Sequence, residues 1–75
     1  MAKVLITGWQ VGLHKISMTK LIQQYTPLGL SDAKAATDRV LDGETVTLTV
    51  TGSEEAERLV QSLKEIGVDA QVVQE

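Results

Sequence analysis

The stretch LGLSDAK, residues 28–34, separates two helical segments that lie between the first two strands of the chain. Before it, the pattern from His14 to about Thr26 has the spacing of an amphipathic helix. Pro27 ends that helix, since a proline biases the preceding residue away from the α region. Within the stretch, Ser31 is a suitable N-cap for a second helix. The sequence therefore predicts a helix hairpin.

The first of these helices has two different faces. A stripe of apolar residues at helical spacing should face the core: Met18, Leu21, Ile22 and Tyr25. The opposite side carries Ile16, Thr19, Lys20 and Gln23. Ile16 is the only apolar residue on that side. A lone apolar residue beside a cation on an exposed face suits protein recognition, and it is equally consistent with a stray surface residue.

Three segments have the alternation of β-strands. Ala2 to Thr7 places Val4 and Ile6 on one face, and residues 68–72 form the last strand. Glu44 to Thr51 alternates between an apolar face and a face of threonines, which indicates a sheet with one buried and one wet side. The apolar faces of the second and third strands consist of Val46, Leu48, Val50, Val68, Ala70 and Val72.

Two further helices complete the pattern. The second runs from the Ser31 cap to about Asp42 and ends at Gly43. The third begins at about Glu54, is capped by Thr51 or Ser53, and ends at Gly67. Their core stripes are Ala33, Ala36, Thr37 and Val40 in the second and Ala56, Leu59, Val60 and Leu63 in the third. Glu54, Glu55 and Glu57 suit the positive end of the third helix.

These elements predict an α+β fold with the order β-α-α-β-α-β. One-sided helices and a one-sided sheet bury their apolar faces together in a two-layer sandwich. We expect a three-stranded, mainly antiparallel sheet covered on one face by three helices, although the pattern leaves the strand order open. A chain of 75 residues holds one core, and we expect residues 1–75 to form one domain.

Composition narrows the function. Hydrophobic residues make up 43% of the chain, phenylalanine is absent, and a core of small aliphatic residues leaves little room for a large cofactor, so we expect none. Without cysteine, a domain this small is more typical of the cytoplasm than of secretion. No apolar run approaches the roughly 20 residues that span a bilayer. A net charge of −3 without a Lys/Arg cluster disfavours direct nucleic-acid binding.

No residues assemble into a catalytic or metal motif. KVLITG at residues 3–8, followed by Gly12, resembles the first strand and turn of dinucleotide-binding proteins, but the third glycine is missing and Trp9 occupies the turn. His14 is the only histidine and has no spaced metal ligand or acid-base partner. Ser17 lies three residues away, without an orienting third group. We therefore expect a protein that is not an enzyme.

Trp9 admits two interpretations. It either covers the open edge of the core or anchors a ligand, since tryptophan is enriched at binding hot spots. The second interpretation gives the rival functional hypothesis, a small-molecule-binding regulatory domain that uses the loop from Gly8 to His14.

The LGLSDAK stretch, the helix from Lys15 to Tyr25 and the closing pattern EEAE (54–57) through IGVDA (66–70) resemble the C-terminal domain of the bacterial ribosomal stalk protein L-seven/L-twelve. The resemblance covers nearly the whole chain and implies the same β-α-α-β-α-β order. It also implies that the helix hairpin pivots on Gly29. The stalk family's N-terminal dimerisation domain and hinge have no counterpart here, so we expect a freestanding relative or an excised domain.

In the stalk family the first two helices of this domain bind translational GTPases through apolar and basic residues. The resemblance therefore implies a protein partner, with a translational GTPase as the candidate, and leaves room for a weak homodimer. The matching partner-binding residues are Ile16, Lys20, Gly29, Leu30 and Lys34. Thr19 and Gln23 stand where the family usually has an aliphatic residue and an arginine.

A second resemblance is to the substrate adaptor of the Clp protease, whose fold is similar and whose opening strand is like residues 3–6. That adaptor reads N-terminal residues with an Asn-Asp pair after the strand. Gly8, Trp9 and Gln10 occupy the corresponding positions here, so the acid that binds the amine is missing. A Clp-type adaptor is therefore a secondary alternative.

Overall fold

A computed structural model describes residues 2–73. The elements follow the predicted order: β1 (Ala2–Trp9), α1 (Lys15–Tyr25), α2 (Leu30–Leu41), β2 (Val46–Val50), α3 (Ser53–Glu65) and β3 (Val68–Val73). Within this range no helix is long and apolar enough to cross a membrane.

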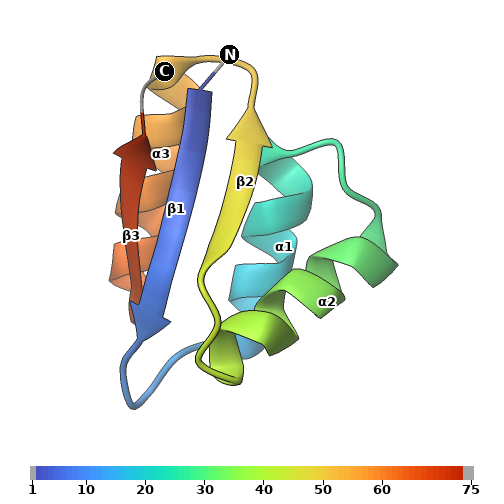
Figure 1. The fold of residues 1–75 in the computed structure, drawn as a ribbon, viewed down its shortest axis with the longest axis vertical. Helices are drawn as coiled ribbons and strands as arrows, with labels where there is room; N and C mark the ends of the chain where they lie inside the picture. Colours follow the sequence, from blue (N-terminus) through green and yellow to red (C-terminus); the bar gives the residue numbers. More distant parts are fainter. Residues whose placement is uncertain (1, 74–75) are drawn as a thin grey trace.

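The sheet has the strand order β2-β1-β3, and β1 pairs antiparallel with both neighbours (Figure 1). The central pairs Val4–Leu48 and Val4–Val72 place apolar residues of all three strands on the same face. Between Ile6 and Gly8 the pairing of β1 with β3 shifts, which marks a bulge or irregularity. The structure thus confirms the α+β class and resolves the strand order that the sequence left open.

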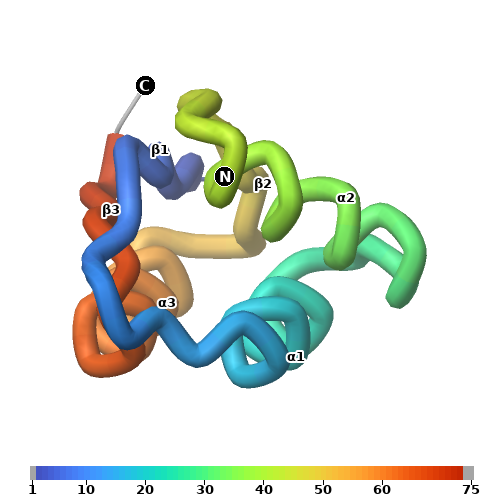
Figure 2. Tube along the Cα trace, turned by 90° about the horizontal axis from the view of Figure 1, so that it is seen from below, coloured from blue at the N-terminus to red at the C-terminus, as the bar shows by residue number. Residues whose placement is uncertain are grey.

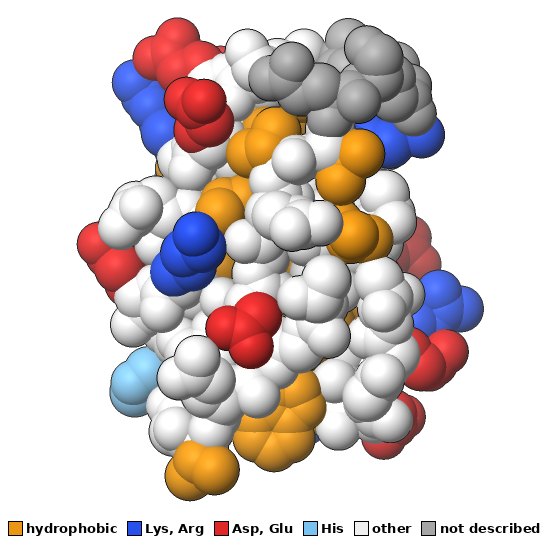
Figure 3. All heavy atoms as spheres, turned by 60° about the vertical axis from the view of Figure 1, so that its left-hand side comes forward, with side chains coloured by type: hydrophobic (Ala, Val, Ile, Leu, Met, Phe, Trp, Pro, Cys, Tyr) orange, Lys and Arg blue, Asp and Glu red, His pale blue; other side chains and the backbone are white. Residues whose placement is uncertain are grey.

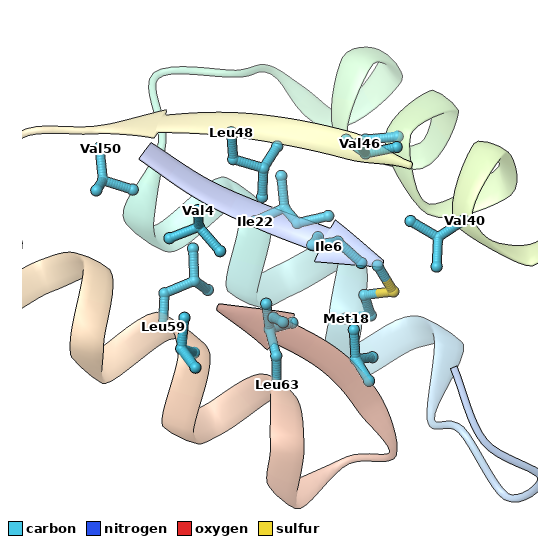
Figure 4. Packing of buried hydrophobic residues seen from close by; sticks show 14 of the residues in the cluster. Val4, Ile6, Met18, Ile22, Val40, Val46, Leu48, Val50, Leu59 and Leu63 are labelled. Atoms are coloured by element: carbon cyan, nitrogen blue, oxygen red, sulfur yellow. The ribbon is translucent and has the colours of Figure 1, made fainter. Parts of the chain in front are cut away.

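The helices bury the apolar face of the sheet. α1 and α3 lie side by side behind the strands, while α2 crosses from α1 toward β2 (Figure 2). The side chains of Val4, Ile6, Met18, Ile22 and Leu59 meet between these layers and are fully buried (Figure 4). Each fully buried aliphatic side chain of this size stabilises the fold by about 1.5–3 kcal/mol.

The predicted core stripes of α2 and α3 are buried at every position. On β3, Val68 and Ala70 are buried and Val72 is half-buried against the core. On α1, Met18 and Ile22 are fully buried, whereas Leu21 and Tyr25 are partly buried at the margin of the core. The prediction was wrong for Thr19, which was placed on the polar face and is buried.

The helix starts also differ from the prediction. Gly29, not Ser31, is the N-cap of α2, because its carbonyl already accepts the Ala33 N–H at 2.9 Å. Gly52, rather than Thr51 or Ser53, is the N-cap of α3. A Cβ on Gly52 would lie only 2.9 Å from a carboxylate oxygen of Glu55, so glycine leaves room for that side chain to fold back over the helix start.

β1 continues two residues beyond its predicted end, so Gly8 and Trp9 belong to the strand and not to the loop. The loop that follows is hydrogen-bonded to the turn after α3. The N–H of Gln10 donates to the carbonyl of Gly67 at 2.8 Å, and the N–H of His14 donates to the carbonyl of Ile66 at 3.2 Å. This turn approaches the loop so closely that a Cβ on Gly67 would lie 3.3 Å from the Cα of Leu13.

Gly67 and Gly43 provide a matched test of this close approach. Their φ angles are +89° and +90°, but only Gly67 faces a neighbouring backbone. Gly43→Ala should lower the free energy of unfolding by about 1 kcal/mol, the cost of a left-handed alanine. Gly67→Ala should cost about 2–3 kcal/mol, because the loop must also move. Urea denaturation of the two variants measures the difference. Equal losses in the free energy of unfolding would show that the loop can move away from residue 67 without an energetic cost.

Candidate functional site

A groove runs between α1 and α2 on the surface of the helix hairpin. Its volume is about 350 Å³. It is lined by Lys15, Ile16, Thr19, Lys20, Gln23, Leu30, Lys34 and Asp38. We call it the α1–α2 groove.

Two buried threonines connect α1 and α2 at the α1–α2 groove: Thr19 forms part of its floor, and Thr37 is fully buried beside Thr19. The hydroxyl oxygens of Thr19 and Thr37 lie 3.1 Å apart and hydrogen-bond across the helix interface. Thr19 Oγ1 is also 3.2 Å from the Lys15 carbonyl, and Thr37 Oγ1 is 3.0 Å from the Ala33 carbonyl. Two hydroxyl protons serve three contacts, so one hydroxyl bonds its own helix while the other bonds across. The pair fixes α1 against α2 beneath the groove.

Apolar side chains are exposed on both walls of the groove. Ile16 on α1 is 74% exposed, and Leu30 on α2 is 52% exposed. Each is followed four residues later by a lysine, Lys20 and Lys34, which therefore lies on the same helix face. The two walls consequently repeat the same combination of an apolar residue and a cation.

The residues that line the groove carry a net positive charge, whereas the chain as a whole is negative. Lys15 Nζ lies 3.3 Å from Asp38 Oδ1, an ion pair that joins the start of α1 to the end of α2. Both side chains are more than half exposed, so this pair contributes well under 1 kcal/mol. Lys20 and Lys34 form no ion pair within residues 2–73. Two uncompensated cations thus face solvent on a chain whose net charge is −3.

Four of the five predicted partner-binding residues come together here: Ile16, Lys20, Leu30 and Lys34 line the groove. Gly29 does not line it, and precedes Leu30 as the N-cap of α2. Its φ of −76° is open to any residue, and a Cβ would meet nothing within 4 Å. The turn between α1 and α2 therefore does not require glycine at position 29, and the binding role of Gly29 stays a prediction.

The sequence missed the polar contacts beneath and beside this surface. Thr19 lies next to Met18 and three residues before Ile22, so its place at the margin of the apolar stripe was the available signal. No comparable signal pairs Thr19 with Thr37 or Lys15 with Asp38, since both pairs depend on how the two helices cross.

The loop of the rival hypothesis follows β1 and leads into α1, whose first residue, Lys15, lines the α1–α2 groove. Trp9 is 41% exposed, and Val11 is completely exposed. The interpretation of Trp9 as a cover for the core is thus not supported by its exposure. Hydrophobic side chains are exposed at the lower end of the molecule, and others lie among polar groups in the upper half of the same face (Figure 3).

Among residues 2–73, the histidine and the acidic side chains are not clustered as a metal site. His14 is exposed at the N-cap of α1. Over residues 2–73, no group of three or more His, Cys, Asp and Glu side chains is arranged to hold a metal ion.

No protein family model matches the chain. The chain is 32% identical over 63 residues to the large ribosomal subunit protein bL12 of Dichelobacter nodosus (strain VCS1703A). The aligned residues are 84% of this chain and 49% of that protein, so the chain spans about half the length of the curated relative it matches. This similarity supports the interpretation of the chain as a relative of the L-seven/L-twelve proteins.

The threonine pair beneath the groove gives a prediction about stability. Thr19→Val and Thr37→Val should each lower the free energy of unfolding by about 1 kcal/mol, because each removes the cross-helix hydrogen bond. The double variant should lose less than the sum, since the second substitution has no such bond left to remove. Urea denaturation provides the cycle, with Thr49→Val on the exposed sheet face as a control. Additive losses would show that the two hydroxyls do not interact.

Proposed function

We propose that this chain is a non-catalytic protein-interaction module of the cytoplasm that docks a ribosome-associated protein in the α1–α2 groove, and that the partner is a translational GTPase. The observation that carries the proposal is the repeated pairing of an exposed apolar residue with a lysine on both walls, Ile16 with Lys20 and Leu30 with Lys34. These are positions at which the stalk-protein resemblance implies factor binding.

The chemistry of the groove defines the partner surface. Exposed aliphatic side chains gain by leaving water, at roughly 25 cal/mol per Å² of apolar area. The lysines add attraction for carboxylates and accelerate encounter with an acidic surface. The partner should therefore present apolar side chains flanked by Asp or Glu.

Two features of the α1–α2 groove lower the affinity that we expect for the partner. Thr19 is buried, so the position at which the family usually has an aliphatic residue contributes to the floor and not to the contact surface. Gln23 lines the groove where the family usually has an arginine, which removes one cation. We expect binding that is weaker and less dependent on salt than with the full basic set.

A titration tests this function. The ¹⁵N-labelled chain is mixed with purified bacterial translational GTPases, and amide shifts are followed. Perturbations should centre on Ile16, Lys20, Leu30 and Lys34. The absence of any perturbation, or one confined to the loop from Gly8 to His14, would contradict the proposal and in the second case favour the rival site.

Charge reversal supplies the matched variants. Lys34→Glu should weaken binding roughly tenfold at low salt, because it replaces an attraction by a repulsion. Lys64→Glu makes the same change in charge on the exposed side of α3 and should have little effect. The difference should shrink as salt is added, since exposed charges are screened. Equal weakening in both variants would indicate only a net-charge effect.

A further inference from the structure

The outer edge of β2 is a second surface, and it has backbone groups that no other strand of the described sheet pairs with. In the sheet formed by the described residues, β2 is an edge strand and pairs only with β1 (Figure 1). In an antiparallel strand, alternate residues direct their N–H and C=O groups to opposite sides. Within residues 2–73, no backbone group of β2 hydrogen-bonds to any segment except β1. The outward-directed groups are therefore available to another strand.

Two adjoining hollows border this edge, and we call them together the β2-edge cleft. The first, of about 290 Å³, lies between α2 and β2 and has Leu28, Ala35, Val46 and Leu48 in its lining. The second, of about 180 Å³, continues past Leu28 and Leu48 toward Thr49. The cleft thus combines unpaired strand groups with apolar walls, the two elements of recognition by strand addition.

We propose that the β2-edge cleft binds an extended segment of a partner protein, which adds a fourth, antiparallel strand between β2 and α2. An extended chain meets the hydrogen-bonding edge at every second residue, which a helix cannot do because its own backbone groups are already paired. Its alternate side chains face the same way as Val46 and Leu48, which are buried on the inner face. Those positions of the segment should be apolar.

Charges on α2 set the direction and sequence of the segment. Asp32 and Arg39 both line the first hollow and form no ion pair with any residue from 2 to 73. Seven helical residues at 1.5 Å each separate them by about 10 Å, so the long side chains at the two ends of a five-residue extended segment, about 13 Å apart, can reach both.

α2 descends obliquely toward the start of β2, and β2 then rises beside it, so a strand antiparallel to β2 runs in roughly the same sense as α2 (Figure 1). The segment therefore begins near Asp32 and ends near Arg39. Its expected pattern is a basic residue, two apolar residues separated by one position, and then an acidic residue.

The probe is a pool of acetylated, amidated pentapeptides of the form Lys-φ-Thr-φ-Glu, in which φ is Val, Ile or Leu. Amide shifts of the ¹⁵N-labelled chain should change at residues 26–28, 32–39 and 46–49. The matched control pool, Glu-φ-Thr-φ-Lys, has the same composition and should bind roughly fivefold more weakly, because both charge contacts become repulsive. Methylating the peptide nitrogens that face β2 should abolish binding.

The variant Asp32→Lys/Arg39→Glu exchanges the two exposed charges and should reverse the preference between the pools. Lys34→Glu should leave peptide binding unchanged, so failure of this proposal is distinguishable from failure of the α1–α2 groove. Three outcomes would overturn the proposal: no shift with any peptide, shifts confined to the α1–α2 groove, or shifts of residues 46–49 that depend on protein concentration without peptide. The last would identify a second copy of the chain as the occupant.

Discussion

β1 occupies the centre of the sheet and organises the packing of both layers. It is the only strand that pairs on both sides in the described sheet, and Val4 and Ile6 on its inner face are completely buried. In a core without phenylalanine, these aliphatic residues hold both layers together, since α2 and α3 both contact β1. Close packing of small side chains leaves little tolerance for a change in volume.

With the sheet fixed by β1, the orientation of the helix hairpin depends on a polar contact. α1 and α2 bury Met18, Ile22 and Ala33, which drive association but are not directional. The hydrogen bond between Thr19 and Thr37 is directional and lies at the helix interface. It therefore restricts how far one helix can slide along the other. The spacing of Ile16, Lys20, Leu30 and Lys34 across the α1–α2 groove follows from that restriction.

The sequence predicted what depends on neighbours along the chain and missed what depends on contact between elements. Periodicity identified all six elements and the buried residues of α2 and α3, because a helical stripe repeats within one segment. The caps at Gly29 and Gly52 were missed because serine and threonine nearby had the stronger intrinsic preference.

Most of the candidate site could also be predicted from the sequence. Ile16 and Lys20 stand on one helical face, and the stalk-protein resemblance supplied Leu30 and Lys34. Spacing within one helix says nothing of the helix opposite. The threonine contact, the ion pair of Lys15 with Asp38, and the cleft beside β2 therefore required the tertiary arrangement.

α2 explains how so short a chain can present two surfaces. Ten of its twelve residues fall into three stripes that point in different directions. Ala33, Ala36, Thr37 and Val40 face the core, Leu30, Lys34 and Asp38 line the α1–α2 groove, and Asp32, Ala35 and Arg39 line the β2-edge cleft. The first stripe is bound by packing, so its residues are constrained by volume. The other two face solvent and are constrained only by what they contact, so substitutions in either can alter recognition at one surface while the core stripe keeps the helix in place.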